Sequence, residues 1–391
     1  MSLWVALTVL ILVCSVPISV MSKPKRSTII CAGLNCLDLQ LIGCTQSGNE
    51  EAIEQYQEAV YCAGGSALQT ATALAKINPD DEQIRTVRVL TKIGKDRNGE
   101  ILMDFMTEAG VDTRLALVDP KGATAMAVLP IFQNGKRGCY FNLASNNSFT
   151  KEELLGQLEK LMINGQPSEA VDAFLFGYPH LMPQLQGENL KSLLKSTKKK
   201  LGENTLIGMD LNGVNADNHG PTTIGPGLQF VDVLHLNEEE AQIIFGKRPG
   251  MTDDAFLRWV AHELHHSGCA VVVLSLGSKG AFLSVTPLEK RLAKCPNKIR
   301  AWGIGSQVRV SAFAIPKGRQ INTNGAGDAL FAGFCWAASQ ELMTLEQAGQ
   351  FAALVARQRC DATTRDTPSH DAQGLLDLVL AGNLPASISD E

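Results

Sequence analysis

Short runs of apolar residues alternate along the chain with longer stretches in which apolar residues recur every three or four positions. Short runs bounded by glycine or polar residues are typical of buried strands, and the longer recurrence is typical of amphipathic helices. The predicted strands are 27–33, 85–93, 171–177, 205–210, 231–236, 270–274 and 307–315. The predicted helices are 67–77, 98–109, 151–162, 189–201, 253–267, 346–359 and 371–380. Parallel strands joined by helical crossovers explain this alternation most simply, so we predict an α/β fold.

A second group of short strands interrupts this rhythm. Residues 39–43 and 59–62 are strand-like runs on either side of a polar stretch. Residues 123–132 and 138–143 are two further runs, and Asn134-Gly135 lies between them. Because Asn-Gly readily adopts the backbone of a tight two-residue turn, we predict a hairpin there.

The two ends of the chain differ from the rest. Residues 3–20 are almost entirely apolar and long enough for a signal or anchor helix, but no positive charge precedes them. Met21 follows directly and would begin an ordinary cytosolic protein. Three interpretations of residues 1–23 stay open, namely a non-native upstream extension, a signal or organelle-targeting segment, and a membrane anchor. We expect a cytoplasmic protein, membrane contact only through a retained anchor, and a disordered tail at 384–391.

Composition narrows the class of protein. With 391 residues, 45% of them apolar, the chain can bury a large core in one or two domains. A net charge of -5 argues against a nucleic-acid-binding surface. The densest basic run, Lys195–Lys200, closes a predicted helix, where lysines complement the helix dipole on a solvated face. Ten cysteines without a CxxC pair indicate buried thiols and a reducing compartment.

The strongest chemical signal is the turn Asn322–Asp328 (NTNGAGD), which precedes an apolar helix. Glycines on both sides of Ala326 allow successive amide N–H groups to converge at the positive end of that helix, which suits an anion. Asp328 lies in the first helical turn, where it could take a proton from a hydroxyl that attacks phosphorus. By itself the turn is explained equally well as a glycine-rich helix start with a solvent-facing aspartate.

Polar residues also follow the predicted strands, where an open α/β sheet has its ligand crevice. Asn35 and Asp38 come after the first strand, and Asp38 is placed to bond the hydroxyls of a polyol. Asn237 and Glu240 follow the strand 231–236 and lie on the same side of one helical turn. Their oxygens suit Mg²⁺, directly or through water, but the same pair also suits a simple helix cap.

One motif points to a different class of chemistry. His262, Glu263 and His266 fit the H-E-x-x-H pattern of zinc hydrolases. The helix that carries them buries a stripe that includes Phe256, which leaves His262 and His265 on or near the solvent side. A zinc hydrolase is therefore a remote alternative.

Taken in order, these segments resemble the ribokinase-like (PfkB) kinases of sugars and nucleosides. The matching pieces, in family order along the chain, are G-x-x-x-x-D at 33–38, Gly64-Gly65, GVDT at 110–113, the hairpin, D-x-N at 210–212, N-x-x-E at 237–240, S-x-G-x-x-G at 275–280 and GAGD at 325–328. The resemblance implies a three-layer sandwich over 24–383, with a mostly parallel central sheet flanked by helices. It also implies a small β lid built from strands in about 39–62 and 112–143.

The resemblance implies a function and roles for individual residues. The reaction would be ATP-dependent transfer of the γ-phosphoryl group to a primary hydroxyl of a sugar. Asp328 would be the general base, and Gly325, Ala326 and Gly327 would form the anion hole. Acceptor-binding residues would be Asn35, Asp38, Gly64, Gly65 and Gln69, and nucleotide-binding residues would be Asn212, Ser275, Gly277, Gly280, Thr323 and Asn324. Mg²⁺ would lie near Asn237 and Glu240, a monovalent cation near Asn322, and two copies of the chain would pair through the lid.

Two positions depart from the family pattern. Asn322 replaces the aspartate of the usual D-T-x-G-A-G-D, so an oxygen ligand is kept but its charge is lost. Gln69 stands where asparagine usually contacts the acceptor. The variant NTNGAGD is similar to inosine-guanosine kinases, so a nucleoside kinase of the adenosine or inosine-guanosine type is an alternative. A second alternative is a non-catalytic relative that only binds nucleotide.

Overall fold

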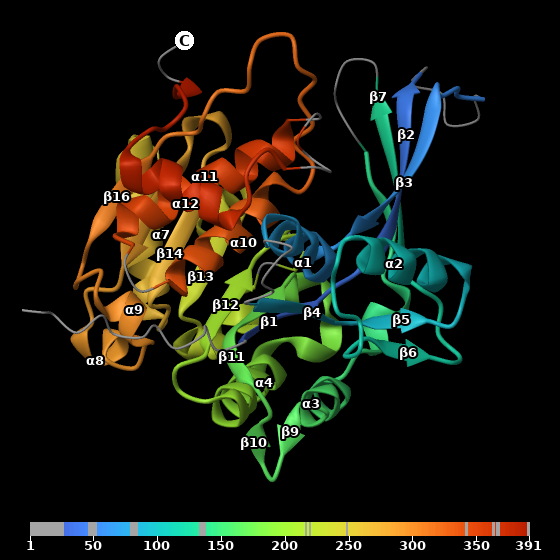
Figure 1. Cartoon of the computed structure of the whole chain (residues 1–391), viewed down its shortest axis with the longest axis horizontal. Helices are drawn as coiled ribbons and strands as arrows, with labels where there is room; N and C mark the ends of the chain where they lie inside the picture. Colours follow the sequence, from blue (N-terminus) through green and yellow to red (C-terminus); the bar gives the residue numbers. More distant parts are fainter. Residues whose placement is uncertain are drawn as a thin grey trace, which may run out of the picture.

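An eight-stranded sheet forms the centre of the molecule (Figure 1). The computed structural model describes residues 27–45, 53–78, 85–132, 138–215, 217–218, 220–247, 249–340, 343–361, 364 and 368–388. In spatial order the strands are β16 (Gln307–Val310), β15 (Ala281–Val285), β14 (Val271–Ser275), β13 (Val233–Asn237), β12 (Leu206–Asp210), β11 (Ala170–Gly177), β1 (Ser27–Gly33) and β4 (Arg85–Leu90). The six strands from β14 to β4 are parallel, while β15 and β16 run antiparallel at one edge.

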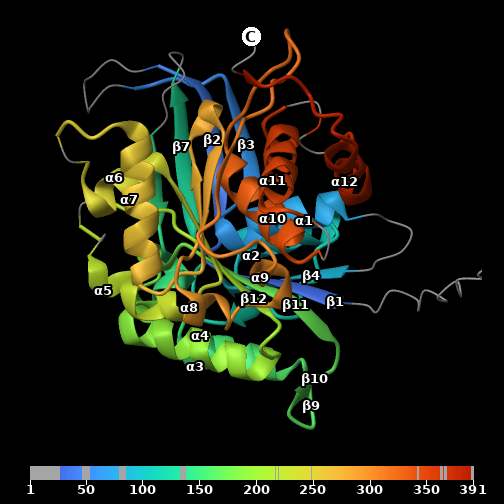
Figure 2. The ribbon, with the colours of Figure 1, turned by 90° about the vertical axis from the view of Figure 1, so that its left-hand side faces the viewer.

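Helices cover both faces of this sheet (Figure 2). One face carries α1 (Ser66–Ile77), α10 (Ala326–Ala338), α11 (Leu345–Cys360) and α12 (Ala372–Ala381). The other carries α3 (Lys151–Glu159), α4 (Gly187–Leu201), α6 (Glu238–Phe245) and α7 (Asp253–His266). In β1, Ile29 and Cys31 pack into the first layer, and Ile30 and Ala32 pack into the second. Because both faces of the sheet are covered by helices, the sequences of its inner strands are mostly unbroken runs of apolar residues. The predicted three-layer α/β fold is confirmed.

A smaller sheet stands apart from the central one (Figure 1). Its strands, in spatial order, are β3 (Glu58–Gly64), β2 (Cys36–Cys44), β7 (Met126–Phe132) and β8 (Tyr140–Asn142). The strands β7 and β8 pair antiparallel, as a hairpin requires, while the predicted Asn134-Gly135 turn lies outside the described residues. The strand β6 (Leu117–Asp119) pairs with β5 (Lys92–Gly94) instead, so the second part of the lid begins later than the predicted residue 112. The helix α2 (Arg97–Glu108) packs beside β2 and β3.

Two predicted strands are shorter in the structure. The run 85–93 divides at Thr91, whose hydroxyl donates to the Gly33 carbonyl (2.8 Å) and accepts from Asn35 Nδ2 (2.6 Å). These bonds draw the chain out of the central sheet after β4. The run 307–315 ends as a strand at Val310, and the residues after it lead irregularly to the 322–328 turn.

The two ends of the chain differ in how much of them the structure describes. Residues 1–23, the apolar segment, lie outside the described residues. None of the helices that the structure describes has both the length and the apolar character to cross a membrane. The predicted start of the disordered tail, residue 384, is too early. The Ala386 carbonyl accepts a hydrogen bond from the Ala314 amide, and the Ile388 amide donates to the Ala312 carbonyl, both at 2.9 Å.

The remaining short elements connect these layers. They are β9 (Met162–Ile163), β10 (Gln166–Pro167), α5 (Pro221–Ile224), α8 (Glu289–Leu292) and α9 (Asn297–Arg300). The nine cysteines in the described part of the chain are free thiols, and six of them are buried as expected. Cys139 is exposed, and Cys62 and Cys360 are half-buried.

Candidate active site

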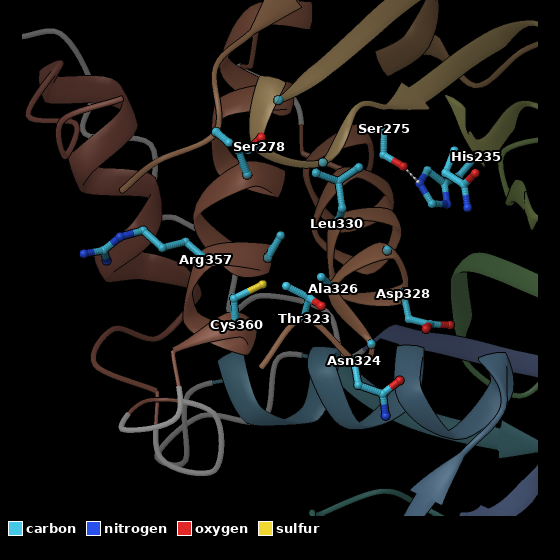
Figure 3. A pocket seen from close by; sticks show the side chains of 18 of the residues that line it. His235, Ser275, Ser278, Thr323, Asn324, Ala326, Asp328, Leu330, Arg357 and Cys360 are labelled. Atoms are coloured by element: carbon cyan, nitrogen blue, oxygen red, sulfur yellow. Dashed lines mark hydrogen bonds between the residues drawn. The ribbon is translucent and has the colours of Figure 1, made fainter. Parts of the chain in front are cut away.

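A cavity of about 560 Å³ opens where the carboxyl ends of β12, β13 and β14 meet the start of α10 (Figure 3). Ligands of open α/β sheets bind at this edge, and the volume suits a small molecule. The predicted site residues that line it are Asn212, Asn237, Glu240, Ser275, Gly277, Gly280, Thr323, Asn324, Gly325, Ala326, Gly327 and Asp328. The fold therefore brings together motifs that are more than a hundred residues apart in the sequence.

The 322–328 turn ends in a glycine that starts α10. Gly325 is the N-cap residue and has a left-handed backbone, with φ of 77°. A Cβ atom there would lie 2.7 Å from Gln69 Oε1 and 3.0 Å from Arg359 Nε, so glycine is needed for both conformation and space. One part of the predicted anion hole is already in use, because the Ala326 amide donates to the Thr323 carbonyl at 3.1 Å. That bond closes the turn.

Asp328 is the third residue of α10 and is only 6% exposed. The Tyr178 hydroxyl donates to both of its carboxylate oxygens, at 3.0 and 3.1 Å. The pKa of Asp328 is raised to about 7, mainly by burial and also by the nearby Asp210 charge, while the Tyr178 hydrogen bond opposes the rise. A carboxylate with a pKa in this range is suited to accept a proton near neutral pH.

A buried histidine links two other parts of the cavity. His235 Nδ1 lies 2.5 Å from Asp210 Oδ1, and its Nε2 lies 3.1 Å from the Ser275 hydroxyl (Figure 3). Burial alone would lower the pKa of His235, but the Asp210 carboxylate more than offsets this, so the pKa is raised. A proton on this imidazole would place a positive charge beside Asp210 and Asp328.

Asn237 and Glu240 form a helix cap at the start of α6. Asn237 Oδ1 accepts from the Glu240 amide, and Glu240 Oε2 accepts from the Asn237 amide, both at 2.8 Å. The pKa of Glu240 is raised to about 8, mainly by burial and also by the charges of Asp210 and Asp328. A divalent cation beside these crowded carboxylates would relieve their repulsion. Within the described ranges no three His, Cys, Asp or Glu side chains form a metal site by themselves.

The predicted acceptor-binding residues form a separate group beside the lid. Asn35, Asp38, Gly64, Gly65 and Gln69 do not line the cavity. A Cβ at Gly64 would lie 2.1 Å from Asp38 Oδ1, and Gly65, with φ of 81°, lies against the backbone of Asn35. The Nδ2 of Asn35 is committed to the protein, because it donates to Thr91 Oγ1 and to the Lys92 carbonyl, whereas the buried Oδ1 has no hydrogen-bond partner among the described residues.

Gln69 connects this group to the 322–328 turn. Its Oε1 accepts from Arg359 Nη2 at 2.6 Å and faces Gly325. Its Nε2 donates to the Ala63 carbonyl at the end of β3. Asn322 does not line the cavity, and its Oδ1 accepts from the Asn324 amide at 3.0 Å.

The H-E-x-x-H motif lies on α7, away from this site. His262 and His266 are exposed, with ring centroids 4.0 Å apart. In the part of the chain that the structure describes, no third ligand joins them in a metal site. The expected exposure of His265 is wrong, because His265 is buried and its ring nitrogens contact the Cys269 carbonyl (3.0 Å) and the Ser284 hydroxyl (2.9 Å).

Three residues of the site were missed in the sequence. Tyr178 directly follows β11, and residues after strand ends often carry function, so its position was a usable signal. His235 lies in the middle of β13, where no such signal marks it. Tyr178 also has a left-handed backbone, with φ of 62°, which is rare outside glycine. Arg359 lies near the end of α11, and only the folded chain places it beside Gly325.

Comparison with known proteins agrees with this fold. Ribokinase from Haemophilus influenzae is 24% identical over 298 residues, which is 76% of this chain and 80% of that protein. The structure of ribokinase from Giardia lamblia superposes with a TM-score of 0.69 at 17% identity, covering 90% of this chain and 99% of that one. Arabidopsis thaliana ribokinase, solved with ribose and ATP, gives a TM-score of 0.67 at 18% identity, covering 91% and 99%.

A family of proteins also matches most of the chain. Residues 27–371 match the pfkB family carbohydrate kinases, a span that includes the lid, the cavity and the 322–328 turn. The chain is a kinase and belongs to the pfkB family of carbohydrate kinases.

Proposed function

We propose that this kinase transfers the γ-phosphoryl group of ATP to a primary hydroxyl of a sugar. One observation carries the proposal, namely the buried Asp328 carboxylate directly after the glycine turn that begins α10. A base and a helix N-terminus at one point serve the two needs of phosphoryl transfer, which are a proton acceptor and stabilisation of the charged phosphoryl oxygens.

ATP is proposed to fill the cavity with its phosphates toward this turn. Apolar side chains at the other side of the cavity, Phe313, Leu330 and Ile388 among them, suit the adenine ring. The amides of Gly325 and Gly327 would bind the transferred phosphoryl group, and that of Ala326 would hold the turn closed. The remaining nucleotide contacts are proposed for Asn212, Ser275, Gly277, Gly280, Thr323 and Asn324.

The acceptor is proposed to bind between the lid and the 322–328 turn. Asp38 is buried on β2, which suits hydrogen bonding to sugar hydroxyls away from water. Gln69 and Gly64-Gly65 would complete this side, and Asn35 would act mainly by holding the backbone there. Closure of the lid would exclude water, which otherwise competes with the acceptor hydroxyl.

A panel of acceptors tests the proposal. ATP consumption, followed as ADP release, is measured with ribose, fructose, adenosine, inosine and guanosine. Turnover with a sugar supports the proposal. Turnover with nucleosides only would favour a nucleoside kinase, for which Asn322 in the NTNGAGD turn is the supporting feature. ATP binding without turnover on any acceptor would favour a non-catalytic relative.

The Tyr178 hydroxyl gives a prediction about pH. Tyr178→Phe removes a hydrogen bond that favours the charged form of Asp328, so the pKa of Asp328 should rise. We expect the acidic limb of the kcat/KM profile to move up by about one pH unit, with the two rates converging above about pH 9. The exposed Tyr140→Phe serves as the control. An unchanged profile in Tyr178→Phe would remove Tyr178 from the account.

Glu240 gives a prediction about Mg²⁺. Magnesium keeps several waters and binds substrate phosphates, so one carboxylate acting directly or through water is sufficient. Glu240→Gln keeps an oxygen for the helix cap but loses the charge, and we expect the Mg²⁺ concentration for half-maximal rate to rise about tenfold. Glu239→Gln, on the exposed side of the same turn, is the control. An equal Mg²⁺ requirement in both variants would place the metal elsewhere.

Pairing of two chains through the lid is also proposed. Tyr61 and Tyr140 are 49% and 73% exposed on β3 and β8, the outer strands of the lid sheet as described. Outer strands with exposed aromatic rings favour association with another copy. Analytical ultracentrifugation should give a dimer that Tyr140→Arg weakens. A monomer at micromolar concentration would contradict this arrangement.

A further inference from the structure

A second concave site lies at the opposite edge of the central sheet. It is a groove of about 840 Å³ between the end of α4, the segment before β13, and α8. We call it the basic groove, and it is lined by Lys195, Lys198, Lys199, Glu203, Gln229, Phe230, Asp232, Leu288, Glu289, Lys290, Arg291 and Lys294. The groove lies at the amino ends of β12 and β13, whereas the candidate active site lies at their carboxyl ends.

The floor of the basic groove is fixed by a buried charge network. Lys198 Nζ lies 3.1 Å from one Asp232 oxygen, and Arg291 Nη2 lies 3.1 Å from the other. Lys198 also donates to the Thr205 carbonyl (2.7 Å), and Arg291 Nε donates to the Gly268 carbonyl (2.6 Å). One carboxylate thus meets two cations, so the floor itself carries excess positive charge on side chains that cannot move away.

The rim adds positive charge that the protein does not neutralise. Lys195, Lys199, Lys290 and Lys294 are exposed, and in the described part of the chain none of their ammonium groups forms an ion pair or hydrogen bond. Two exposed glutamates at the rim do not balance them. In a protein of net charge -5, gathering six cations in one groove costs electrostatic repulsion that a bound anion would relieve.

The lysines of α4 alone would need no ligand, because lysines at a helix C-terminus complement its dipole. That explanation is weaker for Lys290, Arg291 and Lys294, because α8 has only four residues and so a small dipole. These three residues lie about ninety residues further along the chain, on α8 or just after it. The fold places this second basic run directly across the groove from the first. Two basic runs that converge on one concavity indicate a shared anionic partner.

We propose that the basic groove binds a small organic polyphosphate. Lysine ammonium groups are strong point-charge donors to phosphate oxygens. Phe230 and Leu288 give the groove an apolar side, against which the ring of such a molecule can pack. The volume suits one small molecule, and this site is separate from the candidate active site, so the proposal stands whichever acceptor the kinase uses.

Inorganic tripolyphosphate is the probe for this site. Its affinity is measured by titration calorimetry at low salt on the full chain, on Lys195→Glu/Lys294→Glu, and on the control Lys191→Glu/Lys121→Glu. The control makes the same charge change outside the groove. We expect the groove variant to bind about tenfold more weakly and the control to bind like the wild type. Equal affinity in all three proteins, or an equal loss in both variants, would overturn the proposal.

Hydrogen exchange places the probe independently of the substitutions. Tripolyphosphate should slow exchange at 195–203 and 288–294 in the wild type, and the groove variant should lose this protection while it keeps its melting temperature and ATP turnover. Protection confined to 322–328 would show that the probe occupies only the active site and would refute a second site. Binding to vesicles of anionic phospholipid without binding to tripolyphosphate would likewise reject a small polyphosphate.

Discussion

Replacing Asp328 with asparagine is expected to lower kcat about a thousandfold, while the Kd for ATP changes less than about threefold. Asparagine has nearly the shape of aspartate and can still accept the Tyr178 hydrogen bond, but it cannot accept a proton from the acceptor hydroxyl. The loss should therefore appear in kcat rather than in ATP binding. Single-turnover kinetics and equilibrium ATP binding on the same preparation separate the two effects.

The stability of the Asp328→Asn variant serves as its control. The pKa of Asp328 in the folded protein, about 7, lies above the value of about 4 for an unfolded chain. The folded state therefore loses stability as pH rises from about 4 to about 7, and the full cost of the buried charge persists above that range. The variant should melt higher than the wild type at pH 8 and equally at pH 4. A variant that keeps normal turnover would show that Asp328 is not the base.

Replacing Gly325 with valine is expected to lower kcat/KM about a hundredfold or more, because it distorts the backbone that starts α10. A β-branched residue strongly disfavours φ of 77°, and its Cβ would meet Gln69 and Arg359 at 3.0 Å or less. The turn must then shift, and its amides no longer converge on the phosphoryl group. Steady-state kinetics with varied ATP and acceptor measure the effect.

Gly382 offers a matched control for this substitution. It also has a left-handed backbone, with φ of 69°, at the end of α12, but a Cβ there would meet no atom within 4 Å. Gly382→Val should cost comparable backbone strain of roughly 1–3 kcal/mol and leave the kinetics unchanged. If both variants lost activity equally, general backbone strain, and not distortion of the active-site turn, would explain the loss in Gly325→Val.

The sequence predicted the class of fold because the inner strands of the central sheet are buried on both faces, unlike the edge strand β16. Runs such as 27–33 and 171–177 can satisfy that burial only in one kind of layered arrangement. Strand ends were less predictable, since they depend on partners far along the chain. The strand β4 ends before Thr91, which forms hydrogen bonds to Gly33 and Asn35, and no local sequence pattern predicts these bonds.

Site residues that lie in a glycine-rich turn or just after a strand could be predicted from the sequence. Site residues that depend on contacts between distant parts of the chain could not. The 322–328 turn carries its chemistry in adjacent residues, so it could be found directly. The Tyr178 contact with Asp328 spans 150 residues, and the Arg359 contact with Gln69 spans 290. Likewise, His265 is buried because its ring reaches Ser284 on a neighbouring strand, which its helical position alone does not show.

The transferred phosphate can be observed directly by ³¹P NMR of the kinase with MgATP and an accepted sugar. The account predicts loss of the γ-phosphate signal of ATP and growth of a phosphomonoester signal, split into a triplet by the two hydrogens on the carbon of a primary hydroxyl. Asp328→Asn should produce neither change on the same time scale. Growth of inorganic phosphate alone, or a doublet from a secondary hydroxyl, would contradict transfer to a primary alcohol at this site.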